Sequence, residues 1–196
     1  AVVTPTFDHA RKEAARAEKA VLDGDDLGLL HGLPLGIKDL EATSGVLTTL
    51  GSQLYANHVP EKDQGSVANI RAEGGIVIGK TNTPEFGLGS HTFNPVHGVT
   101  RNPYDPSRSA GGSSGGAAVA LSTRMLALAD GSDMMGSLRN PAAWNNIYGL
   151  RPSWGLVPSS TSGESFLHQL STLGPMARSP CDIAALLEVQ AGSDPR

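Results

Sequence analysis

The stretch that decides the fold is SRSAGGSSGGAAVALSTRMLALADGSDMMGSLRNPAA, residues 107–143. It holds two loops rich in glycine and serine, 111–116 and 131–137. The first loop is expected to turn abruptly, because glycine allows backbone angles that are closed to other residues. Between the loops, the pattern predicts a closely packed helix over 117–122 and a short buried strand over 125–129. Two serine-bearing turns that flank one such unit are well placed to meet at a single site.

Outside this stretch, helix and strand patterns alternate along the chain. Helices are expected over 7–22, which is amphipathic, over 63–73, from Leu138 with Pro141 in the first turn, and over 180–189; strands are expected over 33–40 and 75–79. The segments 80–103 and 149–163 are rich in glycine and proline and predict loops. The length of 196 residues suits one domain. This alternation favours an α/β sandwich, with the sheet between helices.

The composition excludes several classes of function. The chain is 39% hydrophobic and carries a net charge of -4 without a basic cluster, so we expect no direct contact with nucleic acid. No apolar run is long enough to cross a bilayer, and we expect no membrane partner. The single cysteine, Cys181, cannot form an internal disulfide or a zinc site alone, and we expect no metal. No signal peptide is recognisable, so the expected location is the cytoplasm.

The expected strand over 33–40 carries two adjacent charges, Lys38 and Asp39. Side chains alternate across a strand, so these two point to opposite faces and one of them must face the interior or a cleft. Lys38 has two interpretations. It is either a surface lysine whose stem alone is buried, or a desolvated lysine, neutral enough to act as a base.

Two of the chemical signatures in the sequence lack their usual context. Residues 74–81, GGIVIGKT, match the phosphate-binding pattern G-x-x-x-x-G-K-[ST]. In a true phosphate loop, however, the variable positions form the cradle and a helix begins at the lysine. Here those positions are the strand itself, and Pro84 interrupts any helix. Ser113 and Ser114 each match the nucleophile elbow G-x-S-x-G, but His168 is the one histidine that follows them.

The third signature is a serine–lysine arrangement without histidine, a known variant of the serine–histidine–aspartate triad. Lys38 precedes the first glycine–serine loop, Ser113 lies in that loop, and Ser137 lies in the second. Each serine taken alone would most often be a turn or cap residue. Their shared context favours a catalytic interpretation.

Four motifs resemble the amidase signature family: HGLPLGIKDL, GSVANIRAEGGIVIGKTNTPEFG, NPYDPSRSAGGSSGGAAVA and GSDMMGSLRNPA. The similarity runs from about residue 27 to residue 187. It implies the fold of that family, a mixed β-sheet sandwiched between helices. Domains of the family are considerably longer, so the resemblance implies that residues 1–196 form part of a single domain, its catalytic core, with N- and C-terminal parts outside it.

The resemblance also implies a Ser–cis-Ser–Lys triad made of Ser137, Ser113 and Lys38. Ser137 is then the nucleophile that attacks an amide carbonyl and gives an acyl-enzyme, which water later hydrolyses. Ser113, preceded by a cis peptide, passes the proton from Ser137 to Lys38. This relay requires a neutral lysine. It uses no cofactor and no metal.

The chain departs from the family just before the proposed nucleophile. The family usually has glycine at both preceding positions, and here only Gly136 is kept while Met135 occupies the other. The resemblance places Met134, Met135, Gly136 and Ser114 at the oxyanion hole or the substrate, Asp133 and Arg139 in support of the loop, and 86–91 along the acyl pocket. Methionine keeps a backbone donor, but it restricts the backbone and crowds the site.

The expected function is hydrolysis of a small-molecule amide whose identity the sequence does not give. Three alternatives stay open. The first is the amidase subunit of a tRNA-dependent amidotransferase, which frees ammonia from glutamine. The second is a nucleotide-binding protein that uses residues 74–81. The third is a catalytically silent fragment. Homo-oligomerisation is also left open.

Overall fold

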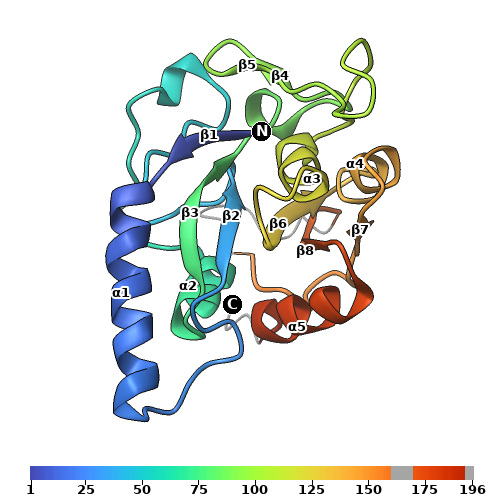
Figure 1. Ribbon diagram of the computed structural model, residues 1–196. Helices are drawn as coiled ribbons and strands as arrows, with labels where there is room; N and C mark the ends of the chain where they lie inside the picture. The colour runs from blue at the N-terminus through green and yellow to red at the C-terminus, as the bar shows by residue number, and fades with distance from the viewer. Residues whose placement is uncertain (160–169, 193–196) are drawn as a thin grey trace.

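The fold is one mixed six-stranded sheet with helices on both faces (Figure 1), seen in a computed structural model that describes residues 1–159 and 170–192. The strand order is β1-β3-β2-β6-β8-β7. Strand β2 runs parallel to β3 and β6, and the other neighbours are antiparallel. The strands are β1 (Val2–Pro5), β2 (Pro34–Lys38), β3 (Ile76–Thr81), β6 (Leu128–Asp133), β7 (Tyr148–Gly149) and β8 (Thr172–Ala177). The expected mixed sheet between helices is confirmed.

Helices α2 and α5 cover one face of the sheet, and α3 and α4 cover the other. The helices are α1 (Phe7–Asp23), α2 (Gly65–Ala72), α3 (Gly115–Ser122), α4 (Arg139–Trp144) and α5 (Pro180–Gln190). Two single 3-10 turns, η1 (Gln53–Tyr55) and η2 (Glu85–Gly87), and a small hairpin of β4 (Phe93–Asn94) and β5 (Gly98–Val99) lie in the loops.

The two faces of the sheet differ in the size of their side chains. On the α2/α5 face, Leu35 and Ile37 of β2 pack against large aliphatic residues such as Ile70 and Leu186. On the opposite face, α3 contributes small residues and is buried along nearly its whole length. A Cβ on Gly116 would lie 2.2 Å from the Asn82 main-chain nitrogen, so glycine is required there. This close approach holds the first turn of α3 against the residue that follows β3.

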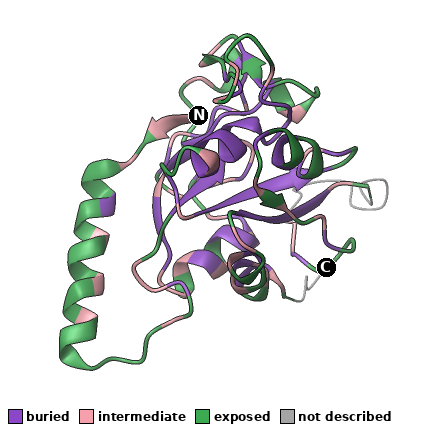
Figure 2. Cartoon of the chain, turned by 45° about the vertical axis from the view of Figure 1, so that its right-hand side comes forward, coloured by how far each residue is buried: buried purple, intermediate pink, exposed green. Residues whose placement is uncertain are grey.

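Helix α1 lies at the edge of the molecule (Figure 2), with Ala10 as its one buried residue. It ends at Gly24, which adopts a left-handed conformation with φ of 76°. Helix α5 begins where Ser179 Oγ accepts a hydrogen bond from the Asp182 main-chain N–H (3.1 Å). Both helices match their predicted ranges closely. Within the described residues, no helix has the length and apolarity needed to cross a membrane.

Two predicted boundaries are wrong. Strand β6 begins three residues later than expected and extends through Asp133, because β2 pairs with its start and β8 pairs with it from Leu128 to Asp133. Its last three residues had been expected in the second loop. Helix α2 begins at Gly65, two residues later than expected, and Gln64 occupies its N-cap position. The Asp63 carboxylate instead accepts hydrogen bonds from Ser44 N (2.7 Å) and Arg71 (2.9 Å).

Candidate active site

The end of β2, the end of β6 and the loop before α3 converge on the amine of Lys38. Lys38 is the last residue of β2 and is completely buried. Its Nζ donates hydrogen bonds to Ser113 Oγ (2.7 Å), Ser114 Oγ (2.9 Å) and Ser132 Oγ (3.0 Å). The interpretation of Lys38 as a surface residue is therefore wrong.

The loop that presents Ser113 depends on the two glycines before it. Gly111 has a φ of 78°, and a Cβ on Gly112 would lie 2.8 Å from the His91 main-chain nitrogen. The Gly112–Ser113 peptide is cis, as the resemblance implied. These features turn the chain so that Ser113 and Ser114 both point at Lys38 before α3 begins.

Burial sets the charge of Lys38. Desolvation lowers the pKa of its amine to about 8, while the nearby carboxylates of Glu41, Asp130 and Asp133 act in the opposite direction. The ordinary value for lysine lies more than two units higher. A useful fraction of Lys38 is therefore neutral close to neutral pH, as a proton acceptor must be.

The hydroxyl protons around Lys38 are not equivalent. Ser114 Oγ donates its proton to the Ser132 carbonyl (3.3 Å), so it is not free to donate to a neutral amine. Ser113 Oγ makes the shorter contact with Nζ, and no other acceptor for its proton is found among the described residues. Of these two neighbouring serines, Ser113 is thus the one that can give a proton to Lys38.

Ser137 lies beside this network on the loop that leads into α4. Its carbonyl accepts a hydrogen bond from the Ser114 main-chain N–H (3.2 Å), which ties the two glycine–serine loops together. Ser137 is half-buried, whereas Ser113 and Ser114 are buried. Within the described residues, the Ser137 hydroxyl has no hydrogen-bond partner. The structure therefore joins Ser113 to Lys38 and places the Ser137 segment against the neighbouring Ser114, with Ser137 the most accessible of the three expected residues.

The buried carboxylate of Asp133 holds the Ser137 loop. It accepts hydrogen bonds from the main-chain N–H groups of Gly136 (2.7 Å) and Leu138 (3.0 Å) and from Arg139 Nε (3.0 Å). Arg151 Nη1 donates to it as well (2.9 Å). Burial alone would raise the pKa of Asp133, but these hydrogen bonds outweigh it and hold the pKa well below the usual range. The geometry agrees with a supporting role for Asp133 and Arg139.

The positions before Ser137 differ from the expected oxyanion hole. The Gly136 N–H already donates to Asp133, so it is not available to a substrate in this conformation. Gly136 has a φ of 114°, whereas Met135 lies outside the left-handed region. Met134 and Met135 are 45% and 85% exposed, so their side chains face the solvent near Ser137. Among the described residues, the N–H groups of Met135 and Ser137 have no acceptor.

Comparisons with known proteins agree with this geometry. The profile of the Amidase family matches residues 1–196. This chain belongs to the amidase signature family. It is 43% identical over 194 residues to a glutamyl-tRNA(Gln) amidotransferase subunit from Thermosynechococcus vestitus, covering 99% of this chain and 40% of that protein. It is 47% identical over 171 residues to the corresponding protein of Thermus thermophilus, covering 87% of this chain and 36% of that protein.

Solved structures of the amidase signature family share the fold. A bacterial aryl acylamidase superposes with a TM-score of 0.94 at 36% identity, covering 99% of this chain and 41% of that one. The peptide amidase of Stenotrophomonas maltophilia gives a TM-score of 0.91 at 36% identity, covering 99% and 40%. The chain thus spans about two fifths of the length of these amidase signature relatives.

Ser114 does not occupy the place that the amidase signature resemblance suggested. It is completely buried, and its hydroxyl and N–H contact Lys38, Ser132 and Ser137. It belongs to the support of the lysine and not to an oxyanion hole. Of the segment 86–91, Ser90 and His91 lie against Gly112 in the Ser113 loop, and His91 Nδ1 is 2.7 Å from Ser109 Oγ. His168, the base required by a nucleophile elbow, lies outside the described residues.

The phosphate-binding pattern does not form a phosphate site. Its variable positions lie in and before β3, and Lys80 is completely buried. Lys80 Nζ donates to the Glu41 carbonyl (2.5 Å) and to Thr43 Oγ1 (2.7 Å). The lysine is therefore held inside the protein by the turn that follows β2, where a phosphate cannot reach it.

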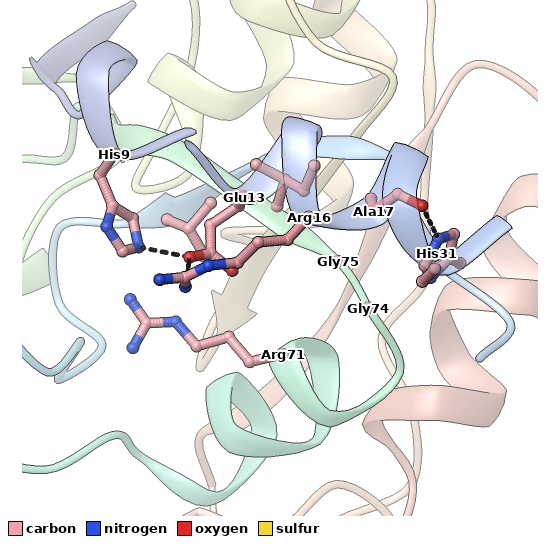
Figure 3. Close-up of a pocket in the computed structure, with 11 residues that line it drawn as sticks. His9, Glu13, Arg16, Ala17, His31, Arg71, Gly74 and Gly75 are labelled. Atoms are coloured by element: carbon pink, nitrogen blue, oxygen red, sulfur yellow. Dashed lines mark hydrogen bonds and ion pairs between the residues drawn. The ribbon is translucent and has the colours of Figure 1, made fainter. Parts of the chain in front are cut away.

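A separate hollow of about 460 Å³ opens between α1 and the end of α2 (Figure 3). Glu13 lies in it, 2.6 Å from Arg16 and 3.8 Å from His9, and His31 Nε2 contacts the Ala17 carbonyl. No residue of the Lys38 network lines this hollow. The hollow is therefore separate from the group of residues around Lys38.

Sequence reasoning missed three residues that contact this centre. Ser132 supplies the third hydroxyl to Lys38, Asp130 contacts the Lys38 main chain, and Arg151 contacts the Asp133 carboxylate. A longer prediction for strand β6 would have placed Asp130 and Ser132 beside β2. No local signal marks Arg151, because it reaches the site from a loop far along the chain.

Proposed function

We propose that this chain carries the catalytic centre of an amide hydrolase, with Ser137 as nucleophile, Ser113 as proton relay and Lys38 as base. The observation that carries the proposal is the contact between the buried Lys38 amine and Ser113 Oγ, 2.7 Å apart. Ser113 lies in a loop that is hydrogen-bonded to the Ser137 segment. A histidine is not needed, because desolvation lets the lysine accept a proton.

In the proposed reaction, Ser137 Oγ forms a bond to the amide carbonyl carbon and loses its proton to Ser113 Oγ. Ser113 gives its own proton to neutral Lys38. When the tetrahedral intermediate collapses, the carbon–nitrogen bond breaks and the proton returns through Ser113 to the leaving amine. Water then attacks the acyl-enzyme by the same relay and releases the carboxylic acid.

The developing negative charge on the carbonyl oxygen needs preorganised donors. We assign this role to the main-chain N–H groups of Met135 and Ser137, since Gly136 N–H is held by Asp133. A rigid loop suits this task, because donors that are already in position need not reorganise during the reaction. Asp133 and Arg139 supply that rigidity from behind the loop.

The proposed substrate is a small-molecule amide. A second candidate function is that of an amidotransferase subunit, which is favoured by the 43–47% identity to proteins named as glutamyl-tRNA(Gln) amidotransferase subunits. The aryl acylamidase and the peptide amidase described above are each 36% identical to this chain. Release of ammonia from glutamine, compared with hydrolysis of aryl and peptide amides, separates the two candidates.

The proposal is tested by labelling the complete polypeptide with a fluorophosphonate, a probe that reacts with activated serines. We expect one adduct, on the peptide that contains Ser137, and none in the Ser137→Ala variant. Ser122→Ala, at the far end of α3, is the matched control and should label normally. Undiminished labelling or hydrolysis in Ser137→Ala would refute the assignment.

A further inference from the structure

A second buried group of charges lies behind Lys38, on the α2/α5 face of the sheet. Lys80 is the register partner of Ile37, and Asp130 follows Leu128 by two residues, so both share the face of the large aliphatic core. Glu41 follows β2 and is also buried, with a hydrogen bond to Gln64 at the start of α2. The Lys38 side chain points to the α3 face instead.

Asp130 makes a direct contact with Lys38 across the sheet. Its Oδ1 accepts a hydrogen bond from the Lys38 main-chain N–H at 2.5 Å. The side chain is 1% exposed, and Oδ2 has no hydrogen-bond partner among the described residues. Burying a carboxylate costs free energy unless hydrogen bonds or an opposite charge compensate it, and a buried carboxylate with one oxygen unpaired is unusual. Packing alone does not explain an aspartate at this position, since the core on this face of the sheet is aliphatic and includes Leu128, two residues earlier on the same strand.

We propose that Asp130 is a positioning residue for Lys38, one that holds the main chain of the base from behind and supplies negative charge to it through the sheet. This inference rests on the proposed function, in which Lys38 is the base. Glu41 also supplies negative charge to Lys38, and Lys80 is the positive group that acts on both carboxylates.

The charged groups around Lys38 come from several elements. Glu41, which follows β2, and Asp130 and Asp133 on β6 act on its amine. Asp39 is the next residue along the chain, and Lys80 lies on β3, on the opposite face of the sheet from the Lys38 side chain. Helix α3 and strand β1 contain no ionisable side chain. Burial raises the pKa of Asp130 to about 6 and that of Glu41 to about 7, so both are largely ionised where Lys38 titrates. Their charge favours the protonated lysine.

Two substitutions separate the two parts of this role. Asp130→Asn keeps an oxygen that can accept the hydrogen bond from Lys38 N–H, but it removes the charge. Asp130→Ala removes both. Because a negative neighbour is lost, Asp130→Asn should lower the pKa of Lys38 further and leave the geometry intact. Glu41→Gln should act in the same direction without touching the Lys38 main chain.

The direct experiment is an NMR titration of the lysine side chains in protein labelled at lysine Cε. The chain has five lysines, so the Lys38 signal is assigned by its absence in Lys38→Met. We expect the Lys38 titration midpoint to fall by about one pH unit in Asp130→Asn, and to fall in Glu41→Gln. Asp26→Asn, an exposed aspartate, is the control and should leave it in place. An unmoved or raised midpoint in folded Asp130→Asn overturns the inference.

Labelling kinetics give the second measurement. In Asp130→Asn, the acidic limb of the rate–pH profile should move to lower pH with the plateau largely kept, whereas Asp130→Ala should lose about tenfold or more of the plateau. Equal plateaus in the two variants would overturn the positioning role. The NMR titration midpoint of Lys38 can be measured in a protein that has no enzymatic activity. A protein whose lysine responds as expected but whose Ser137 is never labelled would therefore refute the proposed function and not this inference.

Discussion

Lys38 on β2 and Lys80 on β3 are neighbours in the sheet with the same burial and different partners. Both are completely buried, and desolvation lowers the pKa of each amine to about 8. Lys38 Nζ is surrounded by three serine hydroxyls. Lys80 Nζ instead meets the Glu41 carbonyl and the Thr43 hydroxyl.

The difference shows that burial alone does not identify a base. A carbonyl has no proton to give, and the Thr43 hydroxyl already donates to the Glu41 carbonyl (3.0 Å). Lys80 therefore has no proton source and serves as an anchor for the turn after β2. Lys38 has Ser113 beside it, and Ser113 lies in a loop bonded to an accessible serine segment.

The largest expected effect comes from removing one lysine or the other. Lys38→Met should lower the rate of fluorophosphonate labelling by about a thousandfold or more, because the base is lost. Lys80→Gln keeps a donor for the Glu41 carbonyl, so its rate should fall far less. Its free energy of unfolding should instead fall by about 1–3 kcal/mol, measured by urea denaturation. Lys12→Met, on exposed α1, should change neither.

The pH dependence sharpens the same comparison. In the proposed mechanism the neutral form of Lys38 is the active one, so labelling should rise with pH through about 8, the pKa that burial gives this amine. Lys38→Arg should be inactive across this range, since a guanidinium stays charged. An active Lys38→Arg variant would contradict the role of Lys38 as a base. A folded Lys80→Gln variant that is labelled as slowly as Lys38→Met would mean that the two lysines do not differ in role.

A smaller effect is expected when Lys38 is separated from its proton source. In Ser113→Ala, Lys38 keeps the hydroxyls of Ser114 and Ser132 and becomes an anchored lysine like Lys80. Ser137 survives without its relay, so we expect weak residual labelling, slower by about a hundredfold. The rise of the rate with pH should also flatten. A Ser113→Ala variant with the normal rate and pH profile would contradict the relay.

The sequence predicted those elements whose patterns are local. The expected helix over 7–22, strand over 75–79 and helix over 180–189 each follow from a pattern within a short segment, and the structure has them nearly as predicted. The contact between Lys38 and Ser113 followed from motif resemblance. Residues 75 positions apart meet there, and no local pattern specifies such a contact.

What the sequence could not predict depends on strand pairing. Strand β8 has the sequence TLGPMA, in which Gly174 and Pro175 argue against a strand, yet it pairs with β6 along its whole length. That pairing extends β6 through Asp133 and buries Asp130. The charge behind Lys38 is thus a product of the tertiary fold. Neither burial nor the register across a sheet can be read from one strand alone.

The smallest expected effect concerns Met135, where the chain departs from the family pattern. Its side chain is 85% exposed and its backbone lies outside the left-handed region, so glycine is not required there. Glycine is instead required at position 136, because its φ is 114° and a Cβ there would lie 2.8 Å from the Asn140 side-chain nitrogen. Methionine at 135 therefore keeps its backbone donor without strain.

Met135→Gly should accordingly leave hydrolysis of a small amide within about threefold of the parent rate, because loss of an oxyanion donor would cost about a hundredfold. On a bulky amide, removing an exposed thioether beside Ser137 should raise kcat/KM by up to about tenfold, the scale of a few methylene contacts. Both rates are measured in the complete polypeptide, with Met125→Gly, at an exposed methionine three residues beyond the end of α3, as the control for flexibility. A gain shared equally by both amides would instead mean that methionine distorts the donor. A large loss of rate on both amides would mean that the Met135 side chain holds the loop in place. The loop would then require a particular residue at position 135 as well as glycine at position 136.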